Sequence, residues 1–362
     1  MSSIWGNNIK ISIFGESHSK AIGVNIDGLP PGYEINLDEI NHQLSRRKSI
    51  NFSISTERQE SDNFKILSGY YNNKTTGTPL CGIFQNNDVY SSPYEKNKHK
   101  PRPGTADFTS YIRYDGFNDF RGGGHNSARL TAGLVFAGNI CYQILKKKYN
   151  IVIGSHISRI YNKKSNKYLN KSNIDVHLLH KLSLEYFPVI VDNDKKEYIE
   201  LLQKFKQSGN TVGGEIEVGI VGLPAGIGCP IFDSLESKIS SLLFSIPSVK
   251  IVDFGLGITE MDGISAKDEF YYDKNLKIKT KMNNNCGILG GISSGNSIIY
   301  RIGFKPIASI YKPQNTIDLK TQKNTTIKIE GHHDVCPVVR AAPIVEGISA
   351  IAILDAVYDK YK

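Results

Sequence analysis

A run of glycines flanked by histidine, asparagine, serine and arginine is the part of this chain best suited to chemistry. It reads Arg121-Gly-Gly-Gly-His-Asn-Ser-Ala-Arg129 and leads directly into a long apolar stretch. Consecutive glycines let backbone N–H groups approach a ligand, because no Cβ stands in the way. A helix that begins after such a loop adds unsatisfied N–H groups and a partial positive charge. The run fits neither the Walker A nor the Rossmann pattern. It predicts an anion site, although a plain tight turn has the same composition.

Four further clusters combine turn residues with groups that transfer protons or bind anions. They are Gly15-Glu-Ser-His-Ser19, Arg102-Pro-Gly-Thr-Ala-Asp107, Asn285-Cys-Gly-Ile-Leu-Gly-Gly-Ile-Ser-Ser-Gly295, and Gly331-His-His-Asp-Val-Cys-Pro337 with Arg340. Taken singly, a surface histidine, a plain loop and a hairpin or bulge explain the first three as well. In the fourth, adjacent histidines on an extended segment point to opposite faces, so proton handling is favoured over metal binding. Together, clusters at strand ends and helix starts favour a functional site.

The charge of the chain favours anionic partners. The 362 residues carry a formal net charge of +9, with 40% hydrophobic and 22% charged residues. Such a balance suits phosphates and carboxylates as well as nucleic acid. The main basic runs, Arg46-Arg-Lys48 and Lys146-Lys-Lys148, fall at the ends of predicted helices, where a solvated C-terminus is the simplest interpretation. No nucleic-acid-binding motif is present, so we expect small polyanions and not nucleic acid.

The cysteines and the hydropathy pattern predict a cytoplasmic protein that does not cross a membrane. Five cysteines stand far apart and never in CxxC spacing, which argues against a disulfide framework and a structural zinc site. The N-terminus lacks the pattern of a signal peptide. The longest apolar stretch, residues 130–145, contains Asn139 and Gln143 and is too short to span a bilayer.

The periodicity of apolar residues predicts mixed strands and helices without regular alternation. Strands are expected at 9–14, 22–26, 151–160 and 214–221, and again from Ile298. Helices are expected after Asn36, at 130–147, 174–186 and 194–207, from Asp233, and at 337–358. A polar segment at 161–173 is expected on the surface. The similarity of Val24-Asn-Ile-Asp-Gly-Leu-Pro-Pro-Gly32 to Val218-Gly-Ile-Val-Gly-Leu-Pro-Ala-Gly226 suggests an internal duplication. The fold class is therefore α+β.

Taken together, the motifs resemble the chorismate synthase family, in its monofunctional bacterial type, over essentially the whole chain. The matches, in order, are Phe14-Gly-Glu-Ser-His18, Gly28-Leu-Pro-Pro-Gly32, Arg46-Arg47, Thr56-Glu-Arg58, Arg102-Pro-Gly104, Ala106-Asp107, Arg121-Gly-Gly-Gly124, Ser127-Ala-Arg129, Cys286-Gly-Ile-Leu-Gly-Gly-Ile-Ser-Ser-Gly295, Lys305-Pro306, His333-Asp334, Cys336 and Arg340-Ala-Ala-Pro343.

The resemblance implies a lyase of the shikimate pathway, which leads to the aromatic amino acids. Such an enzyme eliminates phosphate from 5-enolpyruvylshikimate 3-phosphate (EPSP) in an anti-1,4 sense and gives chorismate. It needs reduced FMN without net redox change. The implied fold is a β-α-β sandwich, in which two antiparallel sheets enclose a helical layer, as one domain over residues 1–362 in a homotetramer. No segment reads as a flavin reductase, so an external reductase is expected, with NADPH as an indirect reductant; direct use of NADPH is the open alternative.

The resemblance also implies roles for individual residues. His18 would protonate the departing phosphate, and Ser17 with Asp334 would relay the proton from C6 by way of the flavin. The substrate's anions would bind to Arg47, Arg129 and Arg340, whose guanidiniums suit bidentate contacts. The flavin would be held by His125, Asn126, Ser127, Pro247, Ser248, Gly290, Lys305, Pro306, Ile307, Ala308, Ser309 and His332.

The chain departs from the family pattern at three positions. Thr105 stands where the family commonly has a histidine, His332 replaces an arginine, and Ser53 replaces another arginine. These departures concern the rate and the flavin affinity more than the reaction class. The competing hypothesis is a flavin- or phosphoester-binding homologue with impaired turnover. A further hypothesis is that His125 or His332 takes over the role of the missing imidazole.

Overall fold

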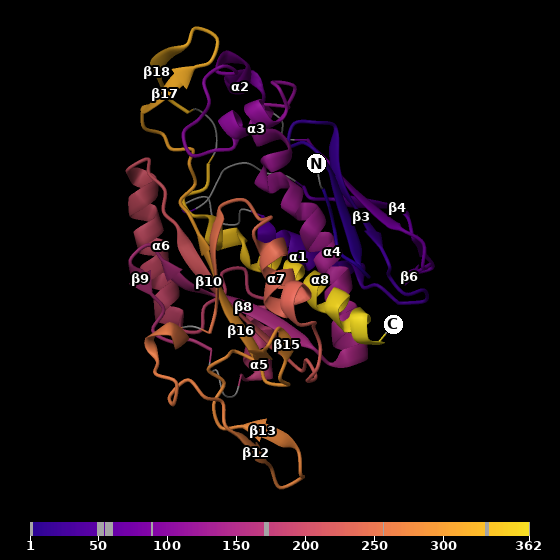
Figure 1. Cartoon of the computed structure of the whole chain (residues 1–362). Coiled ribbons are helices and arrows are strands. Elements are labelled where there is room, and N and C mark those ends of the chain that lie inside the picture. Colours follow the sequence, from indigo (N-terminus) through magenta and orange to yellow (C-terminus); the bar gives the residue numbers. More distant parts are fainter. Residues whose placement is uncertain are drawn as a thin grey trace.

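Two antiparallel sheets stand on opposite sides of a layer of helices in the computed structural model (Figure 1). The structure describes residues 3–48, 54, 61–87, 90–169, 174–255, 257–329 and 333–361. The motif Thr56-Glu-Arg58 and the positions Ser53 and His332 therefore lie outside the described residues. The arrangement is the β-α-β sandwich that the sequence predicted.

The first sheet has the strand order β1-β2-β3-β7-β4, with every neighbouring pair antiparallel. Its strands are β1 (Ile4–Trp5), β2 (Lys10–Gly15), β3 (Ala21–Asp27), β4 (Phe64–Ser68) and β7 (Leu80–Gln85). In β3, Ile22, Val24 and Ile26 are all buried, as the two-residue repeat of a strand requires. The strands predicted at 9–14 and 22–26 are confirmed.

The second sheet has the order β9-β8-β10-β16-β11 and is also antiparallel throughout. Its strands are β8 (Val152–Ile160), β9 (Lys163–Lys164), β10 (Gly214–Val221), β11 (Val249–Phe254) and β16 (Ile298–Phe304). The strands predicted at 151–160, at 214–221 and from Ile298 are confirmed.

The two halves of the chain repeat one topology. The central strand, β3 or β10, leads through the similar Gly-Leu-Pro turn into a helix, α1 (Leu37–Arg47) or α7 (Leu235–Leu243). An edge strand (β4 or β11), an inner strand (β7 or β16) and a long helix then follow, and the sheet positions of these strands correspond. The shared order supports the internal duplication predicted from the sequence.

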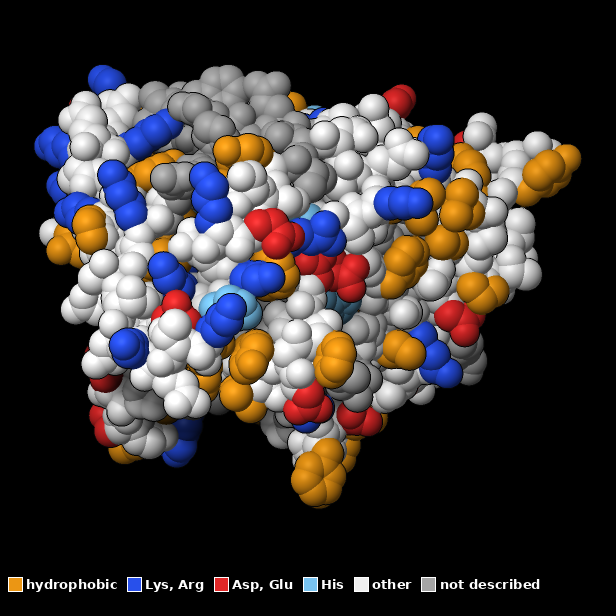
Figure 2. Space-filling view, turned by 90° about the horizontal axis from the view of Figure 1, so that it is seen from above, with side chains coloured by type: hydrophobic (Ala, Val, Ile, Leu, Met, Phe, Trp, Pro, Cys, Tyr) orange, Lys and Arg blue, Asp and Glu red, His pale blue; other side chains and the backbone are white. Residues whose placement is uncertain are grey.

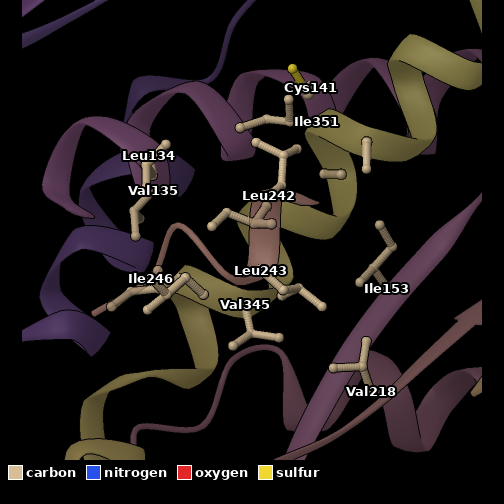
Figure 3. Packing of buried hydrophobic residues seen from close by; sticks show 14 of the residues in the cluster. Leu134, Val135, Cys141, Ile153, Val218, Leu242, Leu243, Ile246, Val345 and Ile351 are labelled. Carbon is tan, nitrogen blue, oxygen red and sulfur yellow. The ribbon is translucent and has the colours of Figure 1, made fainter. Parts of the chain in front are cut away.

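The two long helices, α4 (Thr131–Tyr149) and α8 (Ala342–Tyr361), pack against each other at the centre of the molecule. They touch backbone to backbone, since a Cβ built on Gly138 would lie 2.2 Å from Gly347 Cα. Figure 3 shows apolar side chains of α4, α7 and α8 meeting those of β8 and β10 in the core. The labelled ones include Leu134, Val135, Leu242, Leu243, Val345, Ile351, Ile153 and Val218.

Four further helices lie outside this central layer. They are α2 (Ser92–Lys96), α3 (Asp107–Arg113), α5 (Val176–Leu182) and α6 (Asp192–Gln207). Short 3₁₀ segments are η1 (Arg121–Asn126), η2 (Ala128–Leu130), η3 (Ile231–Asp233), η4 (Ile258–Glu260) and η5 (Pro337–Arg340). Two-stranded hairpins pair β5 (Tyr70–Tyr71) with β6 (Lys74–Thr75), β12 (Phe270–Tyr272) with β13 (Ile278–Thr280), β14 (Ile288–Leu289) with β15 (Ile292–Ser293), and β17 (Gln314–Asp318) with β18 (Lys323–Ile327).

Side-chain caps explain where the helices begin. Asn36 Oδ1 accepts hydrogen bonds from the N–H groups of Asp38 and Glu39, which confirms the predicted cap of α1. The start predicted at Asp233 is wrong, because Ser234 caps α7 and Asp233 lies in η3. The helices predicted at 174–186 and 194–207 are present as α5 and α6 with shifted ends. In the described residues, no helix is long and apolar enough to span a bilayer.

Candidate active site

A cavity of about 1470 Å³ opens where the C-terminal ends of α1 and α7 meet the loops that precede α4 and α8. We call it the main cavity. It exceeds the roughly 300–1,000 Å³ typical of a pocket for one small molecule, so a substrate and a cofactor can share it. Of the predicted site residues that the structure describes, thirteen line it: Arg47, Arg129, Arg340, Asp334, His125, Asn126, Ser127, Pro247, Ser248, Lys305, Ile307, Ala308 and Ser309.

Two of the three arginines share one buried carboxylate. Arg47, the last residue of α1, donates from Nη2 to Asp62 Oδ2 at 2.7 Å, and Arg129 Nη1 contacts the other oxygen, Oδ1. Burial would raise the pKa of Asp62, but the guanidiniums of Arg47 and Arg129 hold it below its usual value. Burial lowers the pKa of Arg47 in spite of Asp62. Arg47 Nε is buried and has no hydrogen-bond partner among the described residues, which leaves a donor for a ligand.

The third arginine belongs to a more open pair. Arg340 Nη2 donates to Asp334 Oδ2 at 2.5 Å, and Arg340 Nη1 donates to the carbonyl oxygen of Arg47 at 3.4 Å. The side chains of Arg340 and Asp334 are 24% and 12% exposed, so solvent and ligands can reach this pair.

The end of α1 is buried, contrary to the prediction for the run Arg46-Arg-Lys48. Arg46 is 1% exposed and donates to Glu346 Oε2 on α8 at 2.5 Å. It also donates to the carbonyl oxygens of Leu182 and Glu185. This buried pair fixes the end of α1 against α8 and thereby orients the neighbouring Arg47. The solvated end predicted for the other run is confirmed, because Lys147 and Lys148 are exposed at the end of α4.

Gly122, one of the three glycines of the first motif, stands between the cavity and the pair Ser17–His18. Gly122, Gly123 and Gly124 all have positive φ, at 60°, 90° and 54°. Gly122 lines the cavity, and a Cβ built on it would lie 2.4 Å from His18 Nε2 and 2.6 Å from Ser17 Oγ. Ser17 and His18 do not line the cavity themselves, because Gly122 stands between them and the cavity. Only glycine allows so close an approach.

Hydrogen bonds fix the orientation of both members of that pair. His18 Nδ1 is 2.8 Å from Ser91 Oγ, and Ser17 Oγ donates to the carbonyl oxygen of Arg121 at 3.3 Å. Ser17 N–H also donates to the carbonyl oxygen of Gly124 at 3.2 Å. Hydrogen bonds therefore join the Gly-rich loop at residues 121–129 to the segment 15–19 at the end of β2, so these two sequence clusters form one unit.

Among the described residues, two imidazoles line the main cavity, one from each of the loops before α4 and α8. His125 Nδ1 is 2.8 Å from the carbonyl oxygen of Gly15 and must be its donor, and His125 Nε2 is 3.0 Å from Ser3 Oγ. His333 lies against Tyr311, with ring centroids 5.7 Å apart. In the described residues no group of histidine, cysteine and carboxylate side chains is placed to hold a metal ion.

The predicted flavin residues 247–248 and 305–309 form one wall. The N–H of Lys305 donates to the carbonyl oxygen of Ser248 at 2.9 Å. Lys305 Nζ donates to the carbonyl oxygen of Gly104 at 2.5 Å, which joins this wall to the turn at residues 102–107. Pro306 does not line the cavity; it is exposed, and a Cβ built on Gly213 would lie 3.2 Å from its Cδ.

The turn at residues 102–107 is closed by an ion pair. Arg102 Nε and Nη2 donate to the two carboxylate oxygens of Asp107 at 2.7 and 2.8 Å. Thr105 lines the cavity, but its hydroxyl donates to the carbonyl oxygen of Arg102 and accepts from the N–H of Asp107. The hydroxyl of Thr105 is thus committed to the turn itself.

Gly290 lies away from the main cavity. It forms the turn between β14 and β15 with φ of 61°. The cluster at residues 285–295 therefore contains a hairpin, which was the simpler of its two interpretations. The N–H of Leu235 donates to the carbonyl oxygen of Gly291, which places the hairpin at the N-terminal end of α7. The cavity lies at the other end of this nine-residue helix, about 13 Å away at 1.5 Å per residue.

Sequence reasoning missed several residues of the cavity. Asp62 follows no recognisable motif, and no signal in the sequence could have found it. The sequence marks Arg102 and Asp107 as parts of a turn and His333 as part of a motif, but it does not show that these residues line the cavity. Among the described residues, seven lysines and arginines and three aspartates line the cavity. Figure 2 shows basic side chains scattered over one face of the molecule among hydrophobic and acidic ones.

Comparison with known proteins identifies the family. The chain matches the family described as chorismate synthase over residues 9–358. The chain belongs to the chorismate synthase family. It is 44% identical to the chorismate synthase of Pyrococcus abyssi over 353 residues, covering 97% of this chain and 96% of that one. It is 39% identical to that of Dehalococcoides mccartyi over 363 residues, covering 98% and 96%. A crystal structure of chorismate synthase shares the fold, with a TM-score of 0.76 at 24% identity, covering 98% of this chain and 93% of that one.

The activity of the chain is accordingly that of the family. It is a carbon–oxygen lyase that converts EPSP to chorismate with loss of phosphate. The alternative of a binding homologue with impaired turnover is not favoured, since these relatives of similar length all carry the enzyme's name.

Proposed function

We propose that the main cavity binds EPSP through Arg47, Arg129 and Arg340, with reduced FMN beside it. The observation that carries this proposal is the convergence of three arginines from α1, the α4 loop and the α8 loop on one cavity. EPSP carries a phosphate and two carboxylates, and charge-assisted bonds from guanidinium groups are the strong way to hold them. The buried Nε of Arg47, which has no partner in the described chain, supports an anionic ligand at this point.

The residues of the wall formed by 247–248 and 305–309 fit a flavin. Ile307 and Ala308 offer an apolar surface, Ser309 and Ser248 add hydroxyls, and Lys305 adds a cation. Gly123 also lines the cavity and leaves open space there, since a Cβ built on it would meet only Ser127 Cβ, at 3.9 Å. Reduced FMN would lend electron density to the substrate and take it back, so that the elimination has no net redox change.

The proton transfers are assigned to residues on both sides of the substrate position. His18 would give a proton to the departing phosphate, and Ser17 and Asp334 would take up the proton lost from C6. Asp334 lines the cavity, and its contact with Arg340 keeps its carboxylate oriented. His18 and Ser17 reach the cavity only past Gly122, so these two roles require the Gly-rich loop to yield when the substrate binds.

Assembly and supply of the cofactor complete the proposal. We expect the 362 residues to act as one domain in a homotetramer, as the family resemblance implies, and the exposed side chains of Ile231 and Phe232, at 77% and 90% exposure, offer apolar surface for a subunit contact. An external flavin reductase would supply reduced FMN, with NADPH as its indirect electron source. The cytoplasm is the expected location, because all five cysteines are free.

Anaerobic release of phosphate from EPSP, with and without chemically reduced FMN, tests the function. Release that requires reduced FMN and yields chorismate supports the whole proposal. Flavin binding without phosphate release would contradict it and would favour the binding homologue. Sedimentation velocity tests the tetramer separately.

A further inference from the structure

Asp62 contacts two of the arginines assigned to the substrate, yet it belongs to no motif. Its Oδ2 accepts from Arg47 and its Oδ1 is in contact with Arg129. Its side chain is fully buried. One carboxylate is thus shared between two cations, with one oxygen for each.

The backbone around Asp62 is arranged to bring it there. Asp62 has φ of +51°, a left-handed conformation that non-glycine residues adopt uncommonly and that often marks functional positions. The preceding residue, Ser61, accepts a hydrogen bond from Lys48 Nζ through its carbonyl oxygen. Two successive residues therefore contact two successive cations, Arg47 and Lys48, at the edge of the cavity.

The charges show why a carboxylate is needed. Without Asp62, Arg47 and Arg129 would be buried side by side, and burial already lowers the pKa of Arg47. Like charges at such short range repel strongly in a poorly solvated site. Arg129 is further fixed by Asn86 Oδ1 at 2.9 Å and by the carbonyl oxygen of Gln85 at 3.2 Å. A carboxylate between the two guanidiniums neutralises half of their charge and sets their separation.

We propose that Asp62 is a positioning residue that holds Arg47 and Arg129 at the spacing required by the substrate's anions. As an internal counter-anion it also prevents the two arginines from binding small anions tightly in place of the substrate. The inference rests on the proposed function, because it takes these arginines as the substrate site.

The variant Asp62→Asn keeps the shape of the side chain and removes its charge. We expect kcat/KM for EPSP to fall by about ten- to a hundredfold, because the guanidiniums lose their fixed geometry. We expect inorganic phosphate to bind at least about threefold more tightly, because one opposing charge is gone. A purely structural role would weaken both functions together, so the opposite signs identify the positioning role. Phosphate binding is measured by calorimetry and by competition with EPSP.

Two further variants make the outcome decisive. Asp62→Glu keeps the charge and moves it by one methylene, so phosphate affinity should stay as in the wild type while kcat/KM falls. Glu217→Gln is the matched control, since Glu217 is a fully buried carboxylate that holds His156 and Arg301 and does not line the cavity. It should lower stability and leave both readouts unchanged.

Three results would overturn the inference. The first two concern Asp62→Asn: a lower affinity for phosphate, or an unchanged kcat/KM. The third is an unchanged kcat/KM in Asp62→Glu, and this result alone decides if Asp62→Asn does not fold. Failure of the proposed function is distinct, since the wild type would then release no phosphate from EPSP, while calorimetry with inorganic phosphate still compares the variants.

Discussion

The loops that lead into α4 and α8 occupy equivalent places in the two halves of the molecule, and each ends on an arginine paired with an aspartate. Arg129 stands two residues before α4 and Arg340 two residues before α8. The pair of Arg129 and Asp62 is buried, whereas Arg340 and Asp334 are partly exposed. The duplication thus supplies two similar arginines whose ion pairs differ in burial. The buried one is fixed before the ligand arrives, and the open one can contact a ligand from the cavity while it holds Asp334.

The difference matters because burial changes what an ion pair contributes. Breaking a buried pair leaves a charge that neither water nor a partner stabilises, whereas an exposed pair is replaced by water at little cost. The first loop should therefore contribute to stability as well as to binding. The second should contribute mainly to binding and catalysis.

The largest expected effect is on stability, in Arg129→Gln compared with Arg340→Gln. Removal of Arg129 leaves Asp62 buried with only Arg47 beside it, so the free energy of unfolding should fall by about 3–5 kcal/mol. Arg340→Gln should cost about 1 kcal/mol or less. Urea denaturation at one protein concentration measures both. Equal losses in the two variants would show that the two loops do not differ as described.

The second effect is the pH dependence of the buried pair. The pKa of Asp62 lies below its usual value in the folded protein, so its stabilisation is fully present above about pH 4 and is lost as the pH falls through the lower, folded pKa. The difference in unfolding free energy between the wild type and Asp62→Asn should therefore narrow on acidification below about pH 4. Denaturation curves at several pH values check this, and a constant difference down to the acid limit would contradict it.

The third effect is a difference in rate between alanine substitutions at two neighbouring glycines of the loop before α4. Gly122 and Gly123 both have positive φ, so alanine should cost each roughly 1 kcal/mol or more of stability. Only Gly122→Ala would also push against His18 and Ser17, whose nearest atoms lie 2.4 and 2.6 Å from the new Cβ. Its kcat should fall at least about tenfold below that of Gly123→Ala. Similar rates in both variants would remove Ser17 and His18 from the proposed chemistry.

The sequence predicts the strands and central helices well, because the alternation of Ile22, Val24 and Ile26 and the cap at Asn36 depend on local spacing. It also predicts most of the residues that meet at the cavity, but it does not predict that Ser17, His18, Pro306 and Gly290 stay outside the lining. It does not predict Asp62, since its role depends on guanidiniums brought together by the fold. For the same reason the burial of Arg46 was missed, because its partner Glu346 lies 300 positions further along the chain.

The smallest expected effect concerns the imidazole missing at Thr105. Among the described residues, each of the two loops gives the cavity one imidazole, His125 or His333, and the hydrogen bonds of the Thr105 hydroxyl lie within the turn at residues 102–107. If His125 or His332 takes over the family's imidazole, Thr105→His should change kcat by less than about threefold, far below the hundredfold or more that a positioned acid–base group contributes. Stopped-flow turnover with reduced FMN measures the change. A gain near a hundredfold would mean that no other imidazole acts in its place, and the histidines of the two loops would then serve binding alone.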